Sequence, residues 1–154
     1  MQSPESLSQV AEFHKTFKHP ILTEPQIPSK SRCELRVSLL SEELNELKEA
    51  IENQDLVEIA DALCDLQYVL SGAVLEFGLA HKFKELFDEV QDSNMSKACR
   101  DEEEAKATVA HYEAKGTSCF YEKDGDKYLV YREGDRKTLK NVNYRPADLK
   151  RILS

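Results

Sequence analysis

The chain has 154 residues, of which 40% are hydrophobic and 32% charged, and its formal net charge is -8. This length is typical of one domain with a single sizeable core, so we predict one domain over residues 1–154. The acidic charge argues against a nucleic acid polymer or an acidic membrane as partner. It permits a small phosphorylated substrate, because bound divalent cations can reverse the local field.

No targeting signal is visible in the sequence. The first residues, MQSPESLSQVAEF, lack the basic and apolar segments of a secretory signal, and no apolar run approaches the roughly 20 residues that span a bilayer. We therefore expect a cytoplasmic protein. The four cysteines are widely spaced without a CxxC pair, which favours reduced thiols packed as small apolar side chains. They are Cys33, Cys64, Cys99 and Cys119.

The first half of the chain is predicted to be helical. Residues 4–18 have their apolar side chains on one stripe, and a loop with three prolines follows. Ser29 or Ser31 is expected to cap the second helix, which runs to about Asn53.

A third helix is predicted over residues 56–77, with Gly78 after its last turn, and a fourth over residues 81–97. The turn between the second and third helices is so short that the two must lie antiparallel. This arrangement indicates a helical bundle.

The C-terminal third has a different character. A charged helix is predicted over residues 101–115, and the segments CFYEK and KYLVYR flank Asp124-Gly125, which predicts a β-hairpin. A short helix, ADLKRIL, ends the chain. The expected fold is mainly α: an antiparallel bundle of four to five helices over about residues 1–98, followed by a helix plus hairpin tail over about residues 99–154.

Two acids on the second helix stand apart from the many that solvation explains. At about 100° per residue, Glu43 lies inside the apolar stripe and Glu46 lies on its border, whereas Glu42 and Glu49 fall on the polar side. A carboxylate that faces a core costs several kcal/mol unless it is paired or binds a metal.

The third helix carries complementary acids. Glu58, Asp61 and Asp65 occupy positions i, i+3 and i+7 on one face of a helix that is apolar nearly all round. Three acids on one face raise each other's pKa unless a cation neutralises them. On either helix alone, surface ion pairing or a structural pairing with Arg36 and Lys48 would be the default explanation.

The joint pattern predicts a metal site between the two antiparallel helices. Its ligands would be Glu43, Glu46, Glu58 and Asp61. All four are hard oxygen donors, which selects Mg²⁺, with Mn²⁺ as a substitute.

These residues also match a family. The strings EELNELKEAI and EIADALCDLQYVL resemble the ExxE and ExxD motifs of the MazG-like and phosphoribosyl-ATP pyrophosphohydrolase superfamily, in which the motif acids hold Mg²⁺. Glu43 and Glu46 correspond to ExxE, and Glu58 and Asp61 to ExxD. Two further segments, FDEVQDSNMSK and LKNVNYRPADL, are similar to segments in a longer branch. The resemblance implies an all-α enzyme that hydrolyses a (d)NTP to the monophosphate and pyrophosphate.

Other residues are candidates for supporting parts. Glu42 would be an outer base or simply solvated, and Asp65 would be a ligand or an acceptor behind the ligands. Arg36 would clamp a phosphate or pair with a core carboxylate. Asn94 and Lys97 continue the apolar stripe of the fourth helix, where they would contact the nucleotide or mark a helix end emerging into water.

The tail offers three more candidates for substrate contacts, which would close over the nucleotide if the tail folds across the site. These are Lys140, Asn143 and Tyr144. The histidines show no ligand spacing and are expected to be surface or packing residues. They are His14, His19, His81 and His111.

Relatives build their sites between subunits, so a homodimer or homotetramer is expected. Two alternatives stay open: a phosphoribosyl-ATP pyrophosphohydrolase, and a non-catalytic helical module whose acids bind a partner protein.

Overall fold

The computed structural model describes residues 2–154, which form six helices and one two-stranded antiparallel hairpin. This confirms the mainly helical class with a small C-terminal hairpin. The chain divides into two compact units, Met1–Lys84 and Glu85–Ser154. The fourth helix, α4 (Phe83–Met95), begins at the end of the first unit and belongs mostly to the second.

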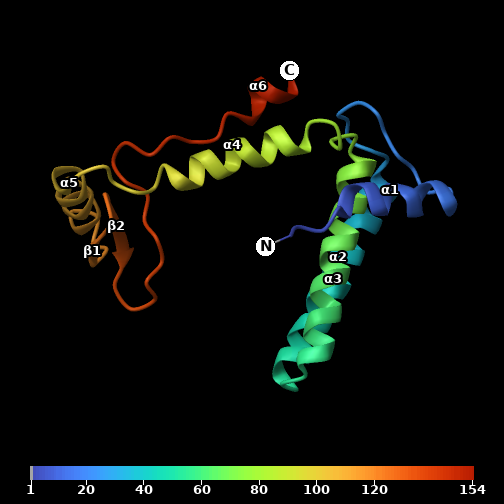
Figure 1. The fold of residues 1–154 in the computed structure, drawn as a ribbon, viewed down its shortest axis with the longest axis horizontal. Helices are drawn as coiled ribbons and strands as arrows, with labels where there is room; N and C mark the ends of the chain where they lie inside the picture. Colours follow the sequence, from blue (N-terminus) through green and yellow to red (C-terminus); the bar gives the residue numbers. More distant parts are fainter. Residues whose placement is uncertain (1) are drawn as a thin grey trace. The chain divides into compact units, whose positions relative to one another are not determined.

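The first unit consists of three helices. They are α1 (Ser6–Thr16), α2 (Lys30–Glu52) and α3 (Leu56–Glu76). Figure 1 shows α2 and α3 side by side along their length, antiparallel as their short connection predicts. Asp55 begins α3, because its side chain accepts hydrogen bonds from the backbone N–H groups of Val57 and Glu58. The predicted bounds of all three helices are confirmed to within two residues.

Helix α1 packs against α3 through a small set of side chains. Val10 and His14 are the buried residues of α1. The ring of Phe13 meets that of Tyr68 edge-on, with the centroids 5.6 Å apart. These contacts hold a helix of only 11 residues, which would be marginal in isolation.

The proline-containing loop between α1 and α2 is fixed to the C-terminal end of α3. The N–H of Leu22 donates to the carbonyl of Leu75 at 3.0 Å, and the N–H of Gln26 donates to that of Phe77 at 3.1 Å. The loop is thereby hydrogen-bonded to backbone carbonyls at the C-terminal end of α3.

The second unit contains the rest of α4, a short terminal helix α6 (Leu149–Leu153), and α5 (Glu102–Glu113) packed on the hairpin. The strands are β1 (Cys119–Asp124) and β2 (Lys127–Arg132), as predicted.

The hairpin turn differs from its prediction by one residue. Asp124 pairs with Lys127, so the two loop residues are Gly125 and Asp126 rather than Asp124 and Gly125. Of these two loop residues, Gly125 alone has a positive φ, at 60°, which fits a type II′ turn with glycine at the first loop position.

The second unit has its own apolar core between α5, the hairpin and the segment that follows it. Two of the four thiols belong to this core, in keeping with their predicted packing as small apolar groups, whereas Cys64 on α3 is exposed. The buried core residues are Cys99, Ala105, Cys119, Val130 and Leu139.

Gly78 generates the first prediction. Its φ is +68°, and a Cβ there would lie 1.9 Å from the carbonyl oxygen of Glu24. We expect Gly78→Ala to destabilise the chain by about 3 kcal/mol or more, because a left-handed conformation and a backbone clash add up. The matched control is Gly125→Ala, where φ is +60° and nothing lies within 4 Å, so only about 1 kcal/mol should be lost. Denaturant unfolding measures both, and equal losses would contradict the clash.

Candidate metal centre

The acids of α2 differ in exposure as their helical phase predicts. Glu43 is half-buried, whereas Glu42, Glu46 and Glu49 are exposed. On α3 of the single chain, Asp65 is half-buried, whereas Glu58 and Asp61 are exposed.

The electrostatic environment of Glu43 is repulsive. Burial raises the pKa of its carboxyl above the ordinary value, and the charges of four neighbouring acids raise it further. In decreasing order of effect, these acids are Asp65, Glu46, Glu42 and Asp61. The structure therefore brings acids from both helices into one patch of negative potential, which a cation would relieve.

The register of the two helices explains why Asp65 has the largest effect among these charges. Arg36 of α2 lies next to Gly72 of α3, since a Cβ on Gly72 would come within 2.7 Å of Nη1 of Arg36. Counting seven residues forward along α2 and seven back along α3 places Glu43 opposite Asp65. Asp65 thus belongs to the acidic patch, and whether it acts as a ligand or behind the ligands stays a prediction.

The donor set fits a hard divalent cation. The four charged groups that raise the pKa of Glu43 are all carboxylates, whose oxygens are the donors that Mg²⁺ prefers. Within residues 2–154, no group of three or more His, Cys, Asp or Glu side chains is already arranged to hold a metal ion. The ligand set of Glu43, Glu46, Glu58 and Asp61 therefore stays a prediction.

Arg36 pairs with a buried carboxylate, which was one of the two alternatives for it. Its guanidinium contacts Oε1 of Glu76, and Arg32 bonds the same carboxylate with its Nε at 3.0 Å from Oε2. Arg36 is 7% exposed and Glu76 is 1% exposed. Burial alone would raise the pKa of Glu76, but the hydrogen bonds and charges of the two arginines lower it below the ordinary value.

Sequence reasoning missed Glu76, although a signal for it existed. Glu76 lies 11 residues after Asp65, which is close to three full helical turns and therefore the same face of α3. It also directly follows the apolar segment LQYVLSGAVL and precedes Phe77. An acid inside so apolar a stretch needs a charged partner, and Arg36 on the apolar stripe of α2 was the available one.

His14 is one of the expected packing residues and is 2% exposed. Its Nδ1 lies 2.9 Å from the carbonyl oxygen of Pro20. A carbonyl oxygen only accepts, so Nδ1 donates and Nε2 is the acceptor of the neutral ring. Burial lowers the pKa of His14, and the hydrogen bond to Pro20 offsets part of that decrease. The neighbouring Arg36 and His19 lower this pKa further, while Glu76 raises it.

A recess of about 380 Å³ opens between α1, α2 and α3. Its walls combine aromatic and aliphatic side chains with a few polar groups. The residues that bear on its chemistry are Phe13, His14, His19, Arg36, Tyr68 and Gly72.

The remaining candidates lie in the second unit. Nζ of Lys97 donates to Oδ1 of Asn94 at 2.8 Å, so these two residues are together. The ammonium of Lys140 lies 4.4 Å from the ring centroid of Tyr144, whose hydroxyl bonds Oγ of Ser93 at 2.8 Å. Whether any of them contacts a substrate stays a prediction.

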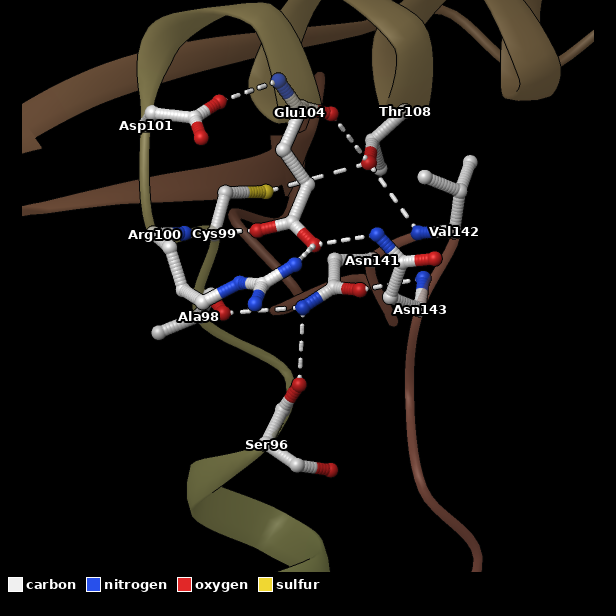
Figure 2. A network of polar contacts seen from close by, with 10 residues as sticks. All are labelled: Ser96, Ala98, Cys99, Arg100, Asp101, Glu104, Thr108, Asn141, Val142 and Asn143. Carbon is white, nitrogen blue, oxygen red and sulfur yellow. Dashed lines mark hydrogen bonds and ion pairs between the residues drawn. The ribbon is translucent and has the colours of Figure 1, made fainter.

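Asn143 belongs to a separate polar network, which Figure 2 shows around the carboxylate of Glu104. The side-chain amide of Asn143 and the backbone N–H of Arg100 both donate to Glu104, which is 7% exposed. Nδ2 of Asn141 donates to the carbonyls of Ser96 and Ala98, each at 2.8 Å. The network therefore joins the two segments SNMSK and LKNVNYRPADL, which are far apart in the sequence.

Within the described range of 2–154, no helix combines the length and the apolar character needed to span a bilayer. The protein is mainly helical, and acids from two antiparallel helices lie in one patch of negative potential.

Comparison with known proteins then gives the family. Residues 10–94, more than half of the chain, match the phosphoribosyl-ATP pyrophosphohydrolase family, and the chain belongs to this family. The matched range contains α2, α3, Glu76 and the acids of the acidic patch.

One similar curated protein is an uncharacterised protein of Acanthamoeba polyphaga mimivirus. It is 38% identical over 74 residues, which are 46% of this chain and 30% of that protein. The chain thus matches less than a third of the length of this relative.

The pair of arginines on Glu76 generates the second prediction. We expect Glu76→Gln to cost about 3–5 kcal/mol at pH 7, because it leaves the buried Arg36 without a countercharge. Glu34→Gln is the matched control. Glu34 forms an exposed ion pair with Lys30 within α2, so this substitution should change the stability little.

The loss should also depend on pH. The folded-state pKa of Glu76 is lowered from an ordinary value of 4.5. Its stabilisation is therefore full above that value and disappears as the pH falls through the lower folded pKa. The free energies of unfolding of the parent chain and of Glu76→Gln should approach each other as the pH falls from 7 to 3. A difference that stays constant over this range would argue against the ion pair.

Proposed function

We propose that the chain hydrolyses a nucleoside triphosphate, preferably a (d)NTP, to the monophosphate and pyrophosphate in a Mg²⁺-dependent reaction. The carrying observation is the half-buried carboxylate of Glu43, whose pKa is raised by acids from two helices. Like charges that lie this close together destabilise the folded chain, and such clusters are typical of functional sites. Membership of a pyrophosphohydrolase family supports the same assignment.

The proposed site gives each acid a role. Glu43, Glu46, Glu58 and Asp61 would hold the cation, which neutralises phosphate charge and lowers the pKa of bound water. Asp65, opposite Glu43, would accept a hydrogen bond behind these ligands or join them. Glu42 is exposed and adds to the negative potential at Glu43, which suits an outer base.

Arg36 contributes by holding the helices in register, since its guanidinium is engaged by Glu76. We retain contacts to the substrate as a hypothesis for residues of the second unit. These are Asn94, Lys97, Lys140, Asn143 and Tyr144.

A second candidate substrate is phosphoribosyl-ATP, and the description of the matched family favours it. Both candidates need the same carboxylate centre, so they differ only in the organic group that is recognised. In either case the reaction would serve nucleotide metabolism in the cytoplasm.

We also propose that the active form is a homodimer or homotetramer. Several large apolar side chains of α2 and α3 are exposed in the single chain. They include Val37, Leu44, Ile51, Leu56, Val57 and Leu63, between 46% and 77% exposed. An apolar surface of this kind is typical of an interface.

The third prediction concerns the carboxylates. We expect Glu43→Gln and Asp61→Asn to reduce pyrophosphate release by about a thousandfold, because losing a cation ligand removes several kcal/mol of charge stabilisation. Both variants should be at least as stable as the parent chain without metal, because a repelling charge is gone.

The matched control is Glu49→Gln on the exposed side of α2, which should keep its activity. A pyrophosphate-release assay with Mg²⁺ across dNTPs, NTPs and phosphoribosyl-ATP measures all three variants. Full activity of Glu43→Gln would overturn the assignment, and absence of release from every nucleotide would favour the non-catalytic module.

The fourth prediction concerns metal-dependent binding. A non-hydrolysable nucleoside triphosphate analogue at about 100 times its dissociation constant should stabilise the chain by about 2.7 kcal/mol when Mg²⁺ is present. EDTA should abolish this shift, since the acidic patch repels the phosphates without a cation. A thermal melt that is the same with and without EDTA would contradict the metal requirement.

A further inference from the structure

The recess between α1, α2 and α3 has walls suited to a flat ring. Phe13 stacks on His19 with the ring centroids 5.8 Å apart and an interplanar angle of 17°, and it meets Tyr68 edge-on. Phe13 and Tyr68 both line the recess, and the two residues are 37% and 38% exposed. Nucleobases stack on exposed aromatic rings of this kind. The volume of about 380 Å³ lies within the range of small-molecule sites.

The floor of the recess carries a hydrogen-bond acceptor. Nδ1 of His14 is committed to the carbonyl of Pro20, so Nε2 of the neutral ring is an acceptor. Nε2 lies close to Gly72, where a Cβ would approach it to 3.1 Å. His14 lines the recess, is 2% exposed, and its ring is held in place by its burial and by its hydrogen bond to Pro20.

Gly72 keeps this floor open. Its position is helical, where alanine would ordinarily be more stable by roughly 0.5–1 kcal/mol. A Cβ there would lie 2.7 Å from Nη1 of Arg36, whose guanidinium is fixed by the buried Glu76. Glycine at this point leaves room next to both polar side chains.

The recess lies next to the acidic patch along the same helix pair. Leu39 lies four residues before Glu43 on α2, and Val69 lies four residues after Asp65 on α3, and both line the recess. Four residues of helix rise about 6 Å. The distance along the helix pair from the acidic patch to the recess therefore suits a nucleotide whose phosphates lie at the acids and whose nucleoside lies in the recess.

We propose that this recess binds the nucleoside part of the substrate, with the base against Phe13 and Tyr68 and a base N–H donated to Nε2 of His14. The proposal rests on the proposed function, because it assigns the organic group of that substrate. A competing occupant, an apolar side chain from a second copy of the chain, would leave no room for a nucleoside.

The test measures nucleoside binding without phosphates and without metal. Saturation-transfer NMR in EDTA, with each common ribo- and deoxyribonucleoside in turn, should show at least one nucleoside binding to the full chain. Phe13→Leu and Tyr68→Leu should each weaken this binding about tenfold. Phe17→Leu is the matched control, because Phe17 is 60% exposed, contacts Phe13 and does not line the recess, so its affinity should equal that of the parent.

Two results would overturn the proposal: no nucleoside binds to the parent chain, or Phe13→Leu and Tyr68→Leu bind as tightly as Phe17→Leu. The pyrophosphate-release assay separates this failure from that of the proposed function. Pyrophosphate release without any effect of Phe13 on nucleoside binding rejects the recess alone. Nucleoside binding that depends on Phe13, in a chain that releases no pyrophosphate, keeps the recess and rejects hydrolysis.

Discussion

The buried ion pairs of Glu76 are the constraint on which the first unit depends. A carboxylate that is 1% exposed is tolerated at the end of α3 only because Arg32 and Arg36 of α2 contact it. Charges this specific allow one register between the two helices, whereas apolar contacts alone would tolerate sliding. The register then determines which acids further along the pair, such as Glu43 and Asp65, lie opposite each other.

Much of this arrangement could be predicted from the sequence, because its signals are local. Apolar periodicity and the short connection before Asp55 predicted α2, α3 and their antiparallel packing. The same periodicity separated Glu43, which is half-buried, from Glu42 and Glu49, which are exposed. Helical phase could single out Glu43 because the acids one residue before it and six residues after it, Glu42 and Glu49, lie on the other side of the helix.

The rest depends on contacts between distant residues, which no local pattern encodes. The partner of Arg36 is 40 residues away, and the recess needs α1, α2 and α3 to meet around Gly72. The Glu104 network likewise joins segments about 40 residues apart. The sequence showed that FDEVQDSNMSK and LKNVNYRPADL resemble segments of one branch of the superfamily, but no local pattern pairs them with each other or with Glu104. Even the hairpin turn was displaced by one residue, because its register depends on cross-strand pairing.

The two charge clusters of the first unit have opposite effects on the stability of the fold, and this difference suits them to different roles. Around Glu76, opposite charges compensate each other, so the cluster stabilises the helix pair in the absence of any ligand. Around Glu43, like charges oppose ionisation, so the cluster is costly until a cation binds. The ion pairs of Glu76 hold the helix pair together and so let it tolerate the repulsion around Glu43. In the proposed function, this repulsion is what would give a cation its affinity. Replacing either cluster by apolar residues would relieve a desolvation cost but remove the register or the site.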